Sequence, residues 1–354
     1  MGFTNSTKLK LITMSILAVI VLIILTVVSL NSTPKTALNA TRQTTLHPLD
    51  NKTIYKDDMR PITKIEKQFR TAGRTVDADA LKVVSSQPGT TWLVGPNASN
   101  PTAQKDIDAV IQTSSEAATQ KTTPVYQLYA IPNRDACADY SKGGFASSSE
   151  YTNWIDQIIA ATKTPSVFLV ETDSIGNIAA KDCLSLSEVS EREQLLKTTV
   201  EKLRQSPNAL AIYLDAAHSE WFPDTSKLVG PLTRSGYDSS DGIFVNTSFF
   251  VETDEITQWS KKLLDELGGN KGVIIDTSRN GSGAPAQDLT GEDRWCNPEG
   301  RSIGVAPNTK TGVNYVHAYL WIKNIGESDG SCADYPTAGT FVPQLALDLV
   351  RNRK

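Results

Sequence analysis

Short runs of β-branched and aromatic residues recur along the chain from about residue 88 onward. Amphipathic segments with helical spacing separate most of these runs, for example 149–162, 187–205 and 254–267. Apolar strands that alternate with helices are typical of a parallel sheet buried on both faces. The predicted strands are 91–94, 125–129, 167–170, 211–214, 242–245, 272–275 and 318–322. About seven strands in roughly 290 residues predict one α/β barrel rather than a small open sheet.

The N-terminus has a different pattern, because residues 11–30 are almost entirely apolar. Twenty residues in a helix span about 30 Å, the thickness of a bilayer's hydrocarbon core. Lys8 and Lys10 precede this run, and basic residues remain on the cytoplasmic side. We therefore predict a cytoplasmic N-terminus at 1–10 and a transmembrane helix or signal-anchor at 11–30. A cleaved signal peptide is the alternative, although Val27-Val28-Ser29 is a poor cleavage site.

Residues 31–58 contain Thr, Asn and Pro but no apolar periodicity. Such a composition is typical of flexible or extended segments. We interpret this segment as a stalk that holds one domain, residues 59–354, away from the membrane. The protein is then expected at the cell surface with an extracellular domain, or secreted if its N-terminal segment is cleaved.

The composition excludes several kinds of function. The 354 residues include 35 Lys and Arg and 39 Asp and Glu, a net charge of −4. Without clustered basic residues, nucleic acid is not an expected partner. The three histidines lie far apart, so we expect no metal site. There is no Walker loop, G-x-G-x-x-G or nucleophile elbow, so we expect no cofactor, and we expect a monomer.

The four cysteines all lie in the part predicted to be exported. They are Cys137, Cys183, Cys296 and Cys332. An even number of cysteines in an oxidising compartment predicts two disulfides, for which three pairings are possible. Pairing of nearest neighbours would join Cys137 to Cys183 and Cys296 to Cys332. Four buried free thiols are the alternative.

Acidic residues stand in the segments that follow the predicted strands. They are Asp135, Asp173, Asp215, Asp276 and Asp329. Because the carboxyl ends of barrel strands meet at one rim, these side chains are expected to converge. Neighbouring carboxylates repel each other, which raises the pKa of some of them. A protonated carboxylic acid beside an ionised one is what glycoside hydrolysis requires. The alternative role for each Asp is a helix cap or a turn residue.

Aromatic side chains lie at or near the same strand ends. They are Trp92, Tyr129, Trp221 and Trp295. The C–H faces of sugar rings are apolar and fit aromatic faces, while carboxylates bind the hydroxyl groups. Each aromatic residue alone is typical of a core, but the set favours a sugar-binding cleft.

Six ordered blocks resemble glycoside hydrolase family 6, the cellobiohydrolase and β-1,4-endoglucanase family. They lie between about Leu81 and Arg351 and read NRDAC, VETDSIGN, YLDAAHSEW, IDTSRNG, WCNPEGR and WIKNIGESDG. The resemblance implies a distorted seven-stranded, TIM-like α/β barrel. It also implies the disulfides Cys137–Cys183 and Cys296–Cys332.

The resemblance further implies roles in an inverting mechanism. Asp173 would be the general acid, and Asp135 would raise the pKa of this acid and help to handle the proton from water. Asp329 occupies the position proposed as base. Tyr129 would distort the sugar at the cleavage point, and Ser141 would position water. The remaining positions expected to contact the sugar are Trp92, Asp215, His218, Trp221, Asn246, Trp295, Lys323 and Glu327.

Some positions depart from the family pattern. Thr172 replaces a Pro, Phe249 stands where Asn is usual, and Val94 is apolar where a polar residue often contacts sugar. No catalytic carboxylate is missing, so we expect an active enzyme on cellulose, cello-oligosaccharides or related β-glucans. The segments 137–154 and 329–332 are short, which predicts an open cleft and endoglucanase action. Exo action of the cellobiohydrolase type and a non-hydrolytic glycan-binding surface protein are the alternatives.

Overall fold

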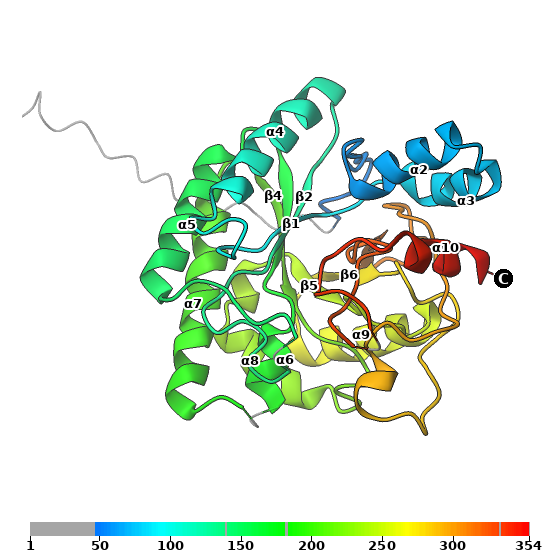
Figure 1. Ribbon diagram of the computed structural model, residues 1–354. Helices are drawn as coiled ribbons and strands as arrows, with labels where there is room; N and C mark the ends of the chain where they lie inside the picture. Colours follow the sequence, from blue (N-terminus) through cyan, green and yellow to red (C-terminus); the bar gives the residue numbers. More distant parts are fainter. Residues whose placement is uncertain (1–46, 139, 181–182, 333, 354) are drawn as a thin grey trace, which may run out of the picture. The chain divides into compact units, whose positions relative to one another are not determined.

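A single sheet of seven parallel strands forms the centre of the protein (Figure 1). The computed structural model describes residues 47–353 except 139, 181–182 and 333. The strands pair in sequence order from β1 to β7, each parallel to the next. They are β1 (Thr91–Leu93), β2 (Val125–Leu128), β3 (Ser166–Val170), β4 (Ala209–Asp215), β5 (Gly242–Val245), β6 (Gly272–Asp276) and β7 (Val316–Leu320). The predicted α/β class and the seven strands are confirmed.

Helices connect most successive strands, as parallel pairing requires. The helices between strands are α4 (Gln104–Gln120), α5 (Ser148–Ala161), α6 (Ser174–Ala180), α7 (Leu186–Gln205), α8 (Ser226–Arg234) and α9 (Thr253–Leu267), with the short 3₁₀ turns η1 (Tyr237–Ser239) and η2 (Gly291–Arg294). The longest of them, α7, begins after Ser185, which forms a reciprocal capping box with Glu188.

Three further helices lie outside this alternation. They are α2 (Pro61–Thr71) and α3 (Thr75–Ser85) before β1, and α10 (Pro343–Arg351) after β7. Ile62, Leu81 and Leu347 join these helices in a separate apolar cluster. This cluster also contains Trp321 and Ile325, so it fixes the helices to the segment that follows β7.

Alternate residues of each strand enter two different cores. In β3, Val167 and Leu169 face a core built mainly from strand residues, the interior of the curled sheet. Phe168 and Val170 instead pack with the surrounding helices. Because side chains alternate along a strand, burial on both faces requires the continuous apolar runs seen in the sequence.

The seam between β1 and β7 corrects the expected barrel. Within the described residues no strand ladder joins these two edges, so the sheet is curled but open. Side chains cross the seam instead: Trp92 Nε1 donates to the Ile322 carbonyl at 2.8 Å, and Thr90 Oγ1 donates to the Trp321 carbonyl at 3.5 Å. The fold is therefore a seven-stranded curled sheet rather than a closed TIM-like barrel.

Residues 47–58, which the sequence pattern assigned to the stalk, pack onto the sheet. Leu49 and Ile54 join the interior core, and Tyr55 is only 4% exposed. Ile54 also forms a parallel bridge with Thr123, just before β2. The packed body thus begins before residue 59. The sequence does not reveal its first segment as part of the core, because three scattered apolar residues produce no periodic pattern.

The predicted cytoplasmic tip, the membrane span at 11–30 and the stalk up to residue 46 lie outside the described residues. Among residues 47–353, no helix has the length and apolar character needed to cross a membrane.

Two disulfides join loops of the folded body. Cys137 pairs with Cys183 and Cys296 pairs with Cys332, which is the pairing that the resemblance implies. The second bridge links the long segment after β6 to the segment after β7, so it lies close to several of the expected site residues.

Candidate active site

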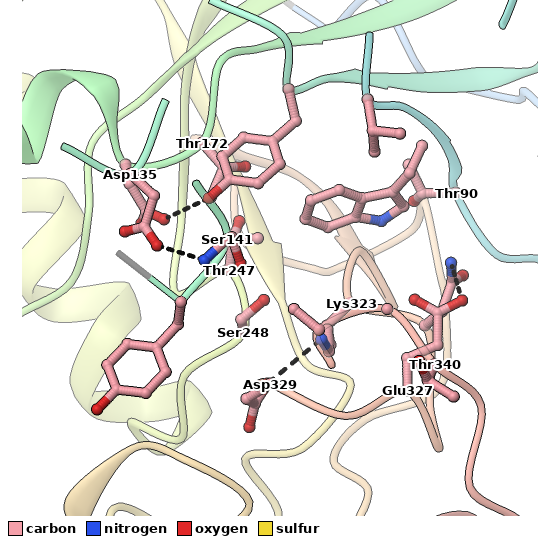
Figure 2. A pocket seen from close by; sticks show the side chains of 18 of the residues that line it. Thr90, Asp135, Ser141, Thr172, Thr247, Ser248, Lys323, Glu327, Asp329 and Thr340 are labelled. Carbon is pink, nitrogen blue, oxygen red and sulfur yellow. Dashed lines mark hydrogen bonds and ion pairs between the residues drawn. The ribbon is translucent and has the colours of Figure 1, made fainter. Parts of the chain in front are cut away.

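A cleft of about 1250 Å³ lies at the carboxyl ends of the strands. Most of the expected site residues line it, and they come from segments far apart in the sequence (Figure 2). They are Trp92, Tyr129, Asp135, Ser141, Asp173, His218, Trp221, Trp295, Lys323, Glu327 and Asp329. The strand ends therefore meet at one rim, as parallel barrel-like topology requires.

Asp173 lies in a tight turn between β3 and α6. Both Glu171 and Asp173 adopt left-handed backbone conformations, with φ of 54° and 67°. The Asp173 amide donates to Asp215 Oδ2 at 3.1 Å, and the Tyr129 hydroxyl donates to Asp173 Oδ2 at 3.5 Å. This turn therefore directs the carboxyl of Asp173 into the cleft beside Tyr129.

The environment of Asp173 favours its protonated form. Burial raises the pKa of Asp173 to about 7, and the negative charge of Asp135 adds to the increase. The hydrogen bond from Tyr129 opposes the change but does not cancel it. A carboxylic acid with a pKa near neutrality can donate a proton to a bound substrate.

Asp135 follows β2 and is held by the loop that carries Ser141. The Ser141 amide donates to Asp135 Oδ2 at 2.6 Å. Arg134 fixes this loop, because its guanidinium donates to the carbonyls of Ser141, Val94 and Tyr129 at 2.6–2.7 Å. Sequence reasoning gave Arg134 no role, although it stands inside the first recognised block.

Asp329 has the opposite electrostatic environment. Arg279 Nη1 and the Asn297 amide donate to Asp329 Oδ2 at 2.7 and 3.0 Å, and Lys323 Nζ lies 3.2 Å from Asp329 Oδ1 (Figure 2). Burial alone would raise the pKa of Asp329, but the charges of Arg279 and Lys323 outweigh it and hold the pKa below its usual value. Asp329 is therefore ionised, and both of its oxygens are occupied.

Two expected sugar contacts do not line the cleft. Asp215 is 1% exposed and accepts the amides of Asp173 and Ala217 at 3.1 and 3.2 Å. Asn246 is fully buried, and its side chain bonds the backbone of Val251 and the carbonyl of Asp276. Both residues stabilise the turns at the rim, because their polar atoms form hydrogen bonds with backbone groups of these turns.

Asp276 likewise acts on the backbone. Its two oxygens accept four amides, those of Ser248, Ser278, Ile322 and Lys323, at 2.9–3.2 Å. This carboxylate therefore joins the ends of β5, β6 and β7. The amides satisfy it in place of water, so its burial is tolerated.

Aromatic side chains form the walls of the cleft. Trp92 packs edge-on against Tyr129 with ring centroids 5.5 Å apart. Trp295 contacts Tyr140 in the same way at 4.7 Å, so Tyr140 is a wall residue that sequence reasoning missed. Their order along the chain gave no sign that Tyr140 and Trp295 would meet.

His218 stacks on Phe249, with ring centroids 3.7 Å apart and planes 9° from parallel. Burial, together with the charge of Arg294, lowers the pKa of His218 to about 3. His218 is therefore neutral at physiological pH. Phe249, which departs from the family pattern, supplies the apolar surface against which the imidazole packs.

The described residues contain no group of three or more His, Cys, Asp or Glu arranged to hold a metal ion.

Comparison with known proteins gives a consistent set of relatives. Residues 49–353 match the family model of glycosyl hydrolases family 6. Endoglucanase A of Cellulomonas fimi is 32% identical over 295 residues, which cover 83% of this chain and 60% of the relative. Endoglucanase 1 of Streptomyces halstedii is 35% identical over 235 residues, which cover 64% of this chain and 68% of the relative.

A solved structure shares the fold over nearly its whole length. The endoglucanase Cel6 from Mycobacterium tuberculosis, in complex with methyl-cellobiosyl-4-deoxy-4-thio-β-D-cellobioside, is 35% identical with a TM-score of 0.75. The match covers 86% of this chain and 99% of that one. In contrast, the chain spans less than two thirds of the Cellulomonas fimi relative.

Proposed function

The chain belongs to glycosyl hydrolases family 6, and on this premise we propose that it is an endoglucanase. It would hydrolyse internal β-1,4-glucosidic bonds of cellulose or a related β-glucan with inversion at the anomeric carbon. The observation that carries this proposal is the carboxyl of Asp173, which has a pKa of about 7 in a cleft with aromatic walls.

Asp173 is the proposed general acid. Its proton passes to the glycosidic oxygen as the bond to the anomeric carbon breaks, so the leaving sugar departs as an alcohol. Tyr129 lies beside this carboxyl and limits the space for the sugar at the cleavage point. The negative charge of Asp135 helps to keep Asp173 protonated until the substrate binds.

Asp135 is also the better candidate for receiving the proton of the attacking water. Ser141 holds its carboxylate through the backbone, and the Ser141 side chain belongs to the same cleft lining. Asp329 is a weak candidate for direct proton removal, because its pKa is lowered and Arg279, Lys323 and Asn297 occupy its oxygens. Its fixed negative charge instead suits the positive charge that develops on the sugar ring.

Endo action is supported by the names of the two relatives and by the short segments 137–154 and 329–332. Short loops leave the cleft without a roof, so an internal part of a long chain can enter from the side. Export to an oxidising compartment is part of the proposal, and the two disulfides support it. Anchoring by residues 11–30 also remains a proposal.

The decisive experiment measures reducing-sugar release from carboxymethylcellulose by the full chain, with Asp173→Ala as the control. We expect the variant to lose about 10²–10⁴-fold in rate, the usual contribution of a general acid. A glycoside whose leaving group needs no proton should restore much of this activity. Equal activity of the two proteins on carboxymethylcellulose would disprove the assignment.

Viscosity of the same solution separates endo from exo action. Internal cleavage lowers viscosity early, when few reducing ends have formed. Release of cellobiose with nearly constant viscosity would instead support the cellobiohydrolase alternative.

A further inference from the structure

The cleft continues beyond Trp92 and Glu327 toward the N-terminal helices. Its lining there comes from Asp57, Met59 and Arg60 before α2, and from Thr340 and Phe341 before α10. We call these residues the distal extension. They lie outside the six recognised blocks, and neither the catalytic residues nor the expected sugar contacts include them.

Arg60 forms one wall of the distal extension. Its Nε donates to the Asp57 carbonyl at 3.1 Å, and its Nη2 donates to the carbonyls of Ser85 and Gln87. The guanidinium lies directly over Gly89, since an added Cβ there would be 2.5 Å from Arg60 Nη1. The Arg60 guanidinium therefore packs against Gly89, which lies three residues before Trp92 in the chain.

Arg60 lines the cleft, and part of its guanidinium carries hydrogens that no described residue accepts. Arg60 Nη1 has no acceptor among the residues that the structure describes, whereas Nε and Nη2 are already used. An arginine has five N–H donors in a fixed plane, so the bonds of Nε and Nη2 also fix the direction of the Nη1 hydrogens and reduce the entropy lost when they bind a ligand.

Met59 supplies an apolar surface at the mouth of the distal extension. Its side chain is 57% exposed, and its backbone amide donates to Asp57 Oδ1 at 2.6 Å. A single exposed apolar side chain is ordinary on a protein surface. Here, however, it lines a continuous cleft that also contains the ring of Phe341.

A second wall of the distal extension, formed by Thr340 and Phe341, is bonded to the segment that carries Glu327. Phe341 forms an antiparallel bridge with Glu327, and the Ser328 amide donates to the Thr340 carbonyl at 2.9 Å. Thr340 lies next to Glu327 in Figure 2. Both walls are therefore attached to the backbone that positions the expected sugar contacts.

We propose that the distal extension is an additional sugar subsite, which binds one glucosyl unit beyond the unit at Trp92 and Glu327. This inference rests on the proposed function and identifies further residues that bind the same substrate. Met59 and Phe341 offer apolar contact to a ring face, while Arg60 and Thr340 offer hydrogen bonds to hydroxyl groups. The occupant is the continuing glucan chain, because the cleft is continuous from Asp173 to Arg60.

The test compares chain lengths. Met59→Ala and Arg60→Ala are introduced separately into the full chain, and kcat/KM is measured on cellotetraose and cellohexaose. We expect kcat/KM for cellohexaose to fall about threefold for Met59→Ala and about tenfold for Arg60→Ala, mainly through KM. Values for cellotetraose, which need not reach the extension, should stay within about twofold of wild type.

Arg74→Ala is the matched control, because Arg74 directly precedes α3 as Arg60 precedes α2, is paired with Asp77 and does not line the cleft. This variant should leave kcat/KM unchanged for both cellotetraose and cellohexaose. Equal losses on both chain lengths, or no loss on either, would overturn the subsite. Met59→Ala alone decides the question if Arg60→Ala fails to fold.

A binding measurement separates this inference from the proposed function. Cellohexaose affinity is measured by calorimetry in Asp173→Asn, with and without Met59→Ala. If wild type hydrolyses no β-1,4-glucan but Met59→Ala still weakens cellohexaose binding about threefold, the proposed function fails and the subsite stands. If hydrolysis occurs and binding does not change, the subsite fails alone.

Discussion

Asp173 and Asp329 lie in one cleft, but the pKa of Asp173 is raised and that of Asp329 is lowered. Asp173 is buried beside another negative charge, so its pKa rises to about 7. Asp329 is also buried, but Arg279 and Lys323 lie within 3.2 Å and lower its pKa. Neighbouring charges therefore determine which carboxyl donates a proton and which remains ionised.

The pH profile tests the influence of Asp135 on the acid. Wild-type kcat/KM should fall as pH rises through about 7, because Asp173 then loses its proton. Asp135→Asn removes a negative charge that opposes ionisation, so the alkaline limb should move down by about one pH unit. The absolute rate will fall as well, so the test compares the pH midpoint of the alkaline limb in the two proteins and not their rates.

Asp108→Asn is the control for this shift, since Asp108 is exposed on α4 and does not line the cleft. Its profile should coincide with that of wild type. An unchanged alkaline limb in Asp135→Asn would show that Asp135 does not govern the pKa of Asp173.

Asp173 should also lower the stability of the folded protein. Its folded pKa is raised from 3.8 to about 7, so between these values the folded state binds more protons than the unfolded state. Stability from this group therefore falls as pH rises through that window. Asp173→Asn should be more stable than wild type by about 2–4 kcal/mol at pH 8 and nearly equal at pH 4. Urea denaturation at both pH values measures this, and a difference that is independent of pH would contradict it.

At the scale of elements, the turns after the strands build the site. Asp135, Asp173, Asn246 and Ser248 all have φ between 56° and 67°. This left-handed region is costly for most residues but is tolerated by Asn and Asp. Sharp turns of this kind let each strand end expose side chains to the cleft while buried polar groups bind the turn amides.

The two disulfides close segments of similar length, with sequence separations of 46 and 36 residues. A crosslink mainly restricts the unfolded chain, and its effect depends only weakly on the length of the closed segment. We expect Cys137→Ser/Cys183→Ser and Cys296→Ser/Cys332→Ser each to lose roughly 2–4 kcal/mol. Thermal denaturation of the two double variants measures the loss. A much larger effect for one pair would mean that native contacts dominate at that bridge.

At the scale of the whole molecule, the packed body includes residues 47–58. Leu49 is fully buried, and Ile54 and Tyr55 are less than 10% exposed. Each buried apolar side chain contributes about 1.5–3 kcal/mol. A protein beginning at residue 59 should therefore be much less stable than one beginning at residue 47, as measured by thermal denaturation.

Leu49→Ala in the full chain provides a milder form of this experiment. It should lower the free energy of unfolding by about 2–5 kcal/mol, because it leaves a cavity in the sheet interior. Lys52→Ala, on the same segment and exposed, should have little effect. Equal stability of the proteins that begin at residues 47 and 59 would show that the segment contributes nothing to folding.

The pattern of the chain specifies the α/β class, the seven strands and the rim at which acidic residues gather. Seven apolar runs separated by amphipathic segments specify parallel strands with helices between them, because burial on both faces leaves few other arrangements. The topology then brings strand ends to one rim, so the grouping of Asp135, Asp173 and Asp329 follows from the sequence. The four cysteines allowed three pairings, and the recognised blocks indicated the pairing that the structure contains.

Which polar groups face the cleft depends on contacts between segments that are far apart in the chain. Asp215, Asn246 and Asp276 stand at strand ends like the proposed catalytic residues. Their polar atoms are nevertheless occupied by the backbone: amides donate to Asp215 and Asp276, and Asn246 donates to the carbonyl of Asp276. The open seam beside Trp92 and the burial of Leu49 in the interior core likewise depend on contacts between distant segments. Position along the chain specifies which strand end a residue follows. Its exposure and its pKa depend on which distant groups the fold places against it.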